Sequence, residues 1–89
     1  MIFEWSEEKR FKVLKKRKLD FMDAKDLFDG RRLITVLSPR GSENRWLSIG
    51  EIDGRLIAVV WMWRDDAIRI ITMRRARDEE KRKYYTLHN

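Results

Sequence analysis

Arginine is concentrated in one part of the chain, and arginine is the side chain best suited to bind a phosphate through two hydrogen bonds. Residues 55–77 contain six arginines, two aspartates and no lysine. Four of the six are Arg69, Arg74, Arg75 and Arg77. Arg74 and Arg75 fall where a predicted strand ends, so their side chains are well placed to reach a phosphate. The pattern predicts a surface that binds a phosphate group.

The sequence offers few other groups for catalysis. It has no cysteine, and its one histidine is His88. No carboxylates have the spacing of a metal site and there is no glycine-rich phosphate loop, so we expect neither metal nor cofactor. Arginine, lysine, glutamate and tyrosine suit metal-free cleavage of RNA, in which the substrate's 2′-hydroxyl is the nucleophile. Glu80 and Tyr84 are candidates to move a proton, because their spacing puts them on one helix face.

A structural interpretation of the same residues stays open. Arg69 can be an ion-paired strand residue, and Arg74–Arg77 can form a solvated corner. The net charge of +6 and the pI near 10.0 fit a polyanion partner and also fit a merely soluble domain. We expect the four tryptophans to pack in the core rather than to stack on bases.

The first thirty residues predict one strand and two helices. Phe3–Trp5 alternates like a strand, and Ser6 caps a helix that ends near Arg17. Asp20 caps a second helix whose apolar residues form one stripe, and Gly30 ends it. That stripe consists of Phe21, Ala24, Leu27 and Phe28.

The rest of the chain predicts a β-meander and a last helix. The expected strands are 33–37, 45–52, 55–63 and 68–73, with a loop at 38–42 around Pro39 and a tight turn at Asp53-Gly54. Strand 55–63 is almost wholly apolar and is expected at the centre of the sheet. Strict alternation would put Arg69, Ile71 and Met73 on one face. Asp78 opens a helix that we expect to end at Tyr84 and Tyr85.

The predicted order β-α-α-β-β-β-β-α is that of a single α+β domain over residues 1–89. We expect a mostly antiparallel sheet with the helices packed on one side. The longest apolar run, residues 56–63, is too short for a membrane span, and the first residues lack the order of a signal peptide. With the absence of cysteine, this favours a cytoplasmic protein without membrane contact.

Several blocks in this order resemble the BrnT family of toxins. They are Phe3-Glu4-Trp5-Ser6, Leu19-Asp20-Phe21 with Ala24 and Phe28, Arg45-Trp46-Leu47-Ser48-Ile49-Gly50, Asp53-Gly54-Arg55-Leu56-Ile57-Ala58-Val59-Val60, Arg69-Ile70-Ile71-Thr72, and Arg74-Arg75-Ala76 with Glu80 and Tyr84. The resemblance covers nearly the whole chain. It implies a RelE-like fold and an RNA-cleaving toxin of a type II toxin–antitoxin module that stops translation without a metal ion.

The resemblance also implies a partner and a site. The implied partner is a small BrnA-like antitoxin with a ribbon–helix–helix DNA-binding part. The toxin would associate with DNA only through this antitoxin. Carried over by position, the catalytic candidates are Arg69, Arg74, Glu80, Tyr84 and Lys16. The RNA-binding candidates are Arg45, Arg75, Arg77 and Arg17. Whether the RNA is cleaved free or on the ribosome is left open.

Two positions depart from the family pattern. Members commonly carry Lys-His-Gly where this chain has Lys16-Arg17-Lys18, and arginine cannot replace a histidine that carries protons. Met73 stands where alanine is common, and its bulk would narrow the site. The alternative function is therefore a catalytically degenerate module that binds RNA or the antitoxin.

Overall fold

The computed structural model describes residues 1–38 and 44–88, so most of the predicted loop around Pro39 lies outside the described residues. Its strands are β1 (Ile2–Glu4), β2 (Leu33–Leu37), β3 (Arg45–Ile52), β4 (Arg55–Arg64) and β5 (Ala67–Arg75). Its helices are α1 (Glu7–Arg17), α2 (Phe21–Ala24), the short 3-10 helix η1 (Lys25–Phe28) and α3 (Asp78–His88). No helix in the described part of the chain is both long and apolar enough to cross a membrane.

The five strands form one sheet in the order β1-β5-β4-β3-β2. Strands β2 to β5 pair antiparallel, whereas β1 runs parallel to β5 over Ile2–Glu4. The predicted central place of β4 is confirmed: its residues from Leu56 to Val59 are all buried. Asp53 and Gly54 both have positive φ, at 51° and 77°, as the predicted two-residue hairpin requires.

Helices α1 and α2 cover one face of the sheet. Ser6 accepts a hydrogen bond from the backbone N–H of Lys9 at the start of α1, and Asp20 does the same for Met22 at the start of α2. Phe21, Ala24 and Leu27 are fully buried against the sheet. The predicted stripe of the second helix is thus real, although the element changes to 3-10 geometry at Lys25.

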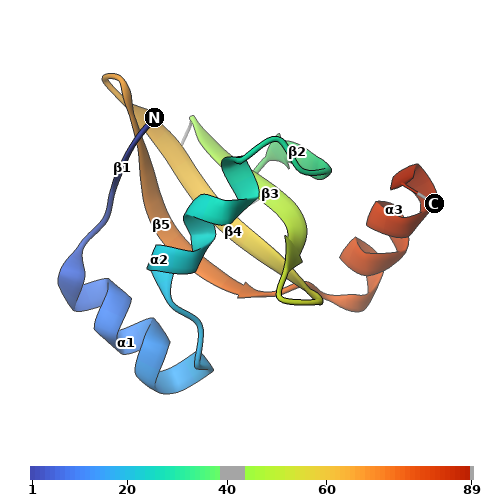
Figure 1. The fold of residues 1–89 in the computed structure, drawn as a ribbon, viewed down its shortest axis with the longest axis horizontal. Helices are drawn as coiled ribbons and strands as arrows, with labels where there is room; N and C mark the ends of the chain where they lie inside the picture. The colour runs from blue at the N-terminus through green and yellow to red at the C-terminus, as the bar shows by residue number, and fades with distance from the viewer. Residues whose placement is uncertain (39–43, 89) are drawn as a thin grey trace.

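The prediction that all helices pack on one side is wrong. Tyr84 of α3 packs in a second apolar cluster with Ile34, Ile49 and Ala58, on the face opposite to α2. Figure 1 shows α3 well apart from α1 and α2. The sheet is therefore covered on both faces, because β3 and β4 alternate apolar residues toward each side. Helix α3 also runs three residues beyond Tyr85, to His88.

An irregularity in β5 changes which side chains share a face. Val60 pairs with Thr72 whereas Trp61 pairs with Ile70, so Ile71 is an extra residue in β5. The predicted strict alternation is therefore wrong beyond Ile70. Met73 is buried in the cluster beneath α2 with Ile68 and Ile70, not on the face of Arg69.

The tryptophans follow the expected packing only in part. Trp61 is buried, donates its indole N–H to Ser48 Oγ at 2.8 Å, and lies 6.3 Å from the Trp46 ring across the hairpin. Trp63 contacts Trp61 edge to face, but its side chain is 52% exposed because it lies near the end of β4.

Candidate functional site

Four arginines from separate elements line one cavity on the α3 side of the sheet. We call this cavity of about 280 Å³ the arginine cleft. Its floor is apolar and comes from β3, β4 and β5, and no described residue that lines it is acidic. The lining residues are Arg17, Ser38, Arg45, Leu47, Val60, Ile71, Thr72, Arg74 and Arg77. A concentration of positive charge over an apolar floor suits a phosphate and the sugar or base attached to it.

The sheet register brings two of these arginines to the same face. Arg74 lies opposite Ala58, and Arg45 lies opposite Met62. Cross-strand partners share a face, so both side chains are on the face of α3. Because Ile71 is an extra residue, Arg74 lies on the same face as Arg69 although the two are five positions apart. Simple alternation would have separated them.

Arg17 reaches the arginine cleft from the other side of the sheet, where α1 lies. Its guanidinium donates to the Met73 carbonyl at 2.8 Å and to Thr72 Oγ1 at 3.4 Å. The last turn of α1 runs beside β5, where β1 no longer pairs with that strand. Arg17 thus fixes the end of α1 to the strand that carries Arg74.

Arg74 is held by a carboxylate behind it. Its two terminal nitrogens donate to the two Glu80 oxygens at 2.8 and 2.9 Å, and Glu80 also accepts from the Arg77 backbone N–H at 2.8 Å. These hydrogen bonds lower the pKa of Glu80 and raise that of Arg74. Glu80 is therefore ionised near neutral pH and orients Arg74, while Arg74 stays charged.

Arg45 has an unused hydrogen-bond donor. Its Nε is buried and has no hydrogen-bond partner among the described residues. Buried donors are nearly always satisfied in folded proteins, so an unpaired one beside a cavity suits an acceptor on a ligand. A phosphate oxygen is such an acceptor.

The other candidates lie outside the arginine cleft. Arg69 is on the same face but forms an ion pair with Glu4 at 3.4 Å. Lys16 is exposed on α1, and Arg75 lines a different pocket next to the β3–β4 turn. The Tyr84 hydroxyl is 3.5 Å from the Arg32 carbonyl, and its ring is buried in the cluster beneath α3. A catalytic role for any of these stays a prediction.

Sequence reasoning missed two hydroxyl groups that line the arginine cleft, those of Ser38 and Thr72. Strict alternation predicted that Thr72 lies on the same face as Ile70. Because Ile71 is an extra residue in β5, Thr72 lies on the opposite face instead. The extra residue also moves Met73 to the other face, so the predicted narrowing of the site by Met73 does not occur. Its side chain is directed away from the arginine cleft and does not narrow it.

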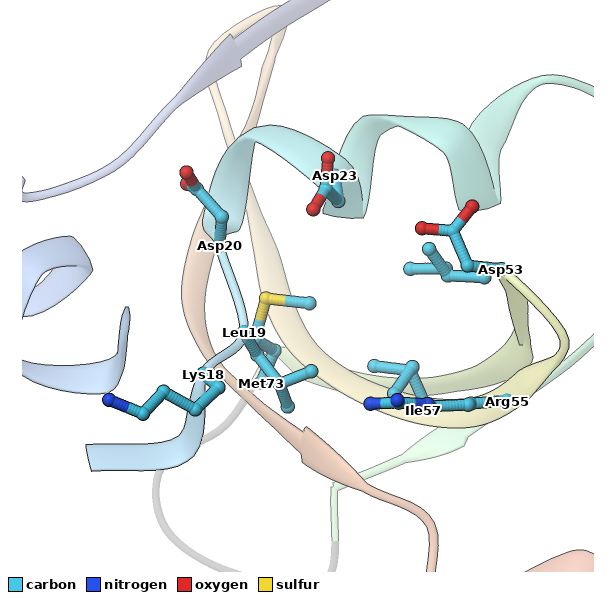
Figure 2. Close-up of a pocket in the computed structure, with 9 residues that line it drawn as sticks. Lys18, Leu19, Asp20, Asp23, Asp53, Arg55, Ile57 and Met73 are labelled. Atoms are coloured by element: carbon cyan, nitrogen blue, oxygen red, sulfur yellow. The ribbon is translucent and has the colours of Figure 1, made fainter. Parts of the chain in front are cut away.

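A second hollow lies under the α1–α2 connection, on the other face of the sheet. Figure 2 shows Met73 and Ile57 at its base, with Asp20, Asp23 and Asp53 around it. Burial, and then the neighbouring carboxylates, raise the pKa of Asp23. Lys18 and Arg55 line the same hollow, so its charge is mixed. The arginine cleft has no acidic residue in its described lining and is the better candidate for a phosphate polymer.

The fold and the arginine cleft together define a basic α+β protein with a cavity lined by four arginines. Residues 5–80 match the family model described as ribonuclease toxin, BrnT, of type II toxin–antitoxin system. That match covers most of the sequence, so the chain belongs to the BrnT family and the predicted resemblance is confirmed. No curated protein matches the sequence. The described residues contain no group of three or more histidine, aspartate or glutamate side chains able to hold a metal ion.

Proposed function

We propose that this chain cleaves single-stranded RNA in the arginine cleft without a metal ion and thereby stops translation. The observation that carries the proposal is the convergence of Arg17, Arg45, Arg74 and Arg77 on one cavity. Membership of the BrnT family supports a ribonuclease toxin of a type II module. A cytoplasmic location, a RelE-like fold and a ribbon–helix–helix antitoxin as the partner are parts of the same proposal.

The proposed reaction uses a nucleophile that RNA itself supplies. The 2′-oxygen attacks the adjacent phosphorus, the bond from phosphorus to the 5′-oxygen breaks, and a 2′,3′-cyclic phosphate forms. One proton leaves the 2′-hydroxyl and one is delivered to the departing 5′-oxygen. The arginines neutralise the charge that builds on the phosphoryl oxygens, which is the largest contribution that such a site makes. Glu80 acts as a positioning residue for Arg74.

Arg74→Ala tests the proposal directly. We expect wild type to cleave a defined RNA in EDTA and Arg74→Ala to lose roughly 10²–10³-fold in rate, as when one preorganised charge-stabilising group is removed. The matched control is Arg82→Ala, which removes an exposed arginine outside the arginine cleft. Gel analysis should find products ending in a 2′,3′-cyclic phosphate. Equal cleavage by wild type and Arg74→Ala would show that the arginine cleft is not the site of cleavage.

A second candidate function rests on Arg17, which holds the place of a histidine common in the family. If the family reaction needs that histidine to carry a proton, this chain binds RNA without cleaving it. Arg17→His separates the two functions. Under the proposed function, Arg17→His cleaves RNA more slowly than wild type at pH 8, where the imidazole is neutral. Its cleavage rate recovers as the pH falls below about 6.5, because the imidazole then carries a positive charge. A gain of cleavage at neutral pH in Arg17→His would favour the degenerate binder.

A further inference from the structure

We propose that a second pocket, on the flank of α3, holds a nucleotide adjacent to the one bound in the arginine cleft. We call it the tyrosine pocket; its volume is about 270 Å³. The residues that line it are Gly54, Arg55, Leu56, Arg75, Lys81 and Tyr85. The inference rests on the proposed function, because it assigns a second part of the same single-stranded RNA.

Two cations of the tyrosine pocket have no ion-pair partner among the residues that the structure describes. Arg75 and Lys81 are exposed, and neither forms an ion pair with any described carboxylate. Arg55 lines this pocket as well as the hollow beneath the α1–α2 connection. No described residue lining the tyrosine pocket is acidic. Arg74 differs from these cations, because it forms an ion pair with Glu80.

Tyr85 offers an aromatic ring held in a fixed orientation. Its side chain is 50% exposed, and its ring meets Tyr84 edge to face at 5.6 Å and 83°. Tyr84 is only 8% exposed, so the contact fixes Tyr85 against the core while one part of the ring faces solvent. A fixed aromatic ring beside unpaired cations is the arrangement by which proteins bind single-stranded nucleic acid.

The two pockets are connected along the chain. Arg74 and Arg75 are consecutive residues of β5, and one lines the arginine cleft while the other lines the tyrosine pocket. Arg77 directly precedes α3 and lines the arginine cleft, and Lys81 is about one helical turn further on. Arg75 lies opposite Ile57, on the face of α2, so the proposed RNA path runs from the arginine cleft around the end of β5 and the start of α3 to Tyr85.

Binding of uncleavable RNA of increasing length tests the inference. The probes are fluorescent 2′-O-methyluridine 3′-monophosphate and 2′-O-methyl oligouridylates of up to about 16 nucleotides, the upper end of the site size for one small single-strand-binding fold. We compare Tyr85→Ala with Tyr85→Phe, which keeps the ring. We compare Lys81→Gln with Lys83→Gln, which removes an exposed charge outside the tyrosine pocket on the same helix. Thermal unfolding verifies that each variant is folded.

We expect Tyr85→Ala to weaken binding of the long strand roughly tenfold, as loss of one stacked base does, and to leave binding of the monophosphate unaffected. Tyr85→Phe should bind like wild type, and Lys81→Gln should weaken binding more than Lys83→Gln. Unchanged long-strand affinity in Tyr85→Ala and Lys81→Gln would overturn the inference, as would equal losses for both lengths.

The proposed function fails separately. If wild type binds RNA with this length dependence but does not cleave it, the inference about the tyrosine pocket stands and only the proposed ribonuclease activity is refuted. Wild type that binds no RNA refutes both.

Discussion

At the scale of single residues, the arginine cleft depends on how each guanidinium is held. Arg74 is oriented by Glu80 and Arg17 by the Met73 carbonyl. Arg45 retains one buried donor that has no partner in the described part of the chain. All four arginines of the arginine cleft are among the candidates predicted from the sequence, whereas Arg69 and Arg75, predicted with them, lie outside it. The sequence did not predict the different partners of these four arginines, because those depend on neighbours five or more positions away in the chain. Glu80 was predicted as a proton carrier, whereas its hydrogen bonds favour a positioning role.

Glu80→Gln tests that role through pH. Arg74 lowers the pKa of Glu80 below its ordinary value of 4.5, so folding is stabilised while the carboxylate is ionised. The contribution is complete above the pKa of the unfolded chain and disappears as pH falls through the lower folded pKa. We expect Glu80→Gln to lose about 1–2 kcal/mol of unfolding free energy at pH 7, and the difference from wild type to vanish in strong acid.

Urea unfolding at a series of pH values measures this difference. Glu79→Gln is the matched control, because Glu79 is the exposed neighbour on α3. A constant difference between Glu80→Gln and wild type down to low pH would mean that ionisation of Glu80 does not stabilise the fold.

At the scale of secondary-structure elements, the sequence predicted the elements themselves better than it predicted how they pack together. The bounds of α1, β2 and β3 agree with the sequence pattern, since each has a cap, a turn or a clear alternation at its ends. The side of the sheet on which α3 packs could not be predicted, because β4 is apolar on both faces and accepts a helix on either. The extra residue Ile71 carries no local signal, yet it decides which side chains face the arginine cleft.

Asp20 joins two elements, and its replacement should affect both. It caps α2, and its carboxylate accepts from Arg10 of α1 at 2.7 and 3.1 Å. We expect Asp20→Ala to lower the unfolding free energy by about 1–3 kcal/mol, through the lost cap and the lost ion pair. Asp20→Asn keeps a capping oxygen and should lose less.

Thermal and urea unfolding measure the effect of Asp20→Ala, and Asp26→Ala, an exposed aspartate of η1, is the control. Equal stability of Asp20→Ala and Asp26→Ala would show that the link between α1 and α2 contributes nothing. Because Arg17 ends α1, we also expect Asp20→Ala to weaken RNA binding in the arginine cleft.

At the scale of the whole molecule, the charge distribution matters more than the net charge of +6. The arginine cleft and the tyrosine pocket are both lined by cations, and the α3 region connects them. The hollow under the α1–α2 connection carries three aspartates together with Lys18 and Arg55, and Arg55 also lines the tyrosine pocket. The side of the protein around α3 therefore attracts a polyanion. An antitoxin that covers this side should present acidic residues to it.

Salt dependence measures how many of these cations contact phosphate. If four arginines of the arginine cleft neutralise phosphates, the logarithm of the RNA binding constant should fall with the logarithm of salt concentration with a slope of about −3. Arg74→Ala should reduce the slope to about −2, because one fewer counterion is released from the RNA. Arg82→Ala should leave the slope unchanged, since Arg82 is exposed and outside the arginine cleft. Anisotropy titrations of a short uncleavable RNA at several salt concentrations provide the measurement. A slope near zero in wild type would mean that the arginines do not bind the RNA backbone, and the proposed mechanism would lose its source of charge stabilisation.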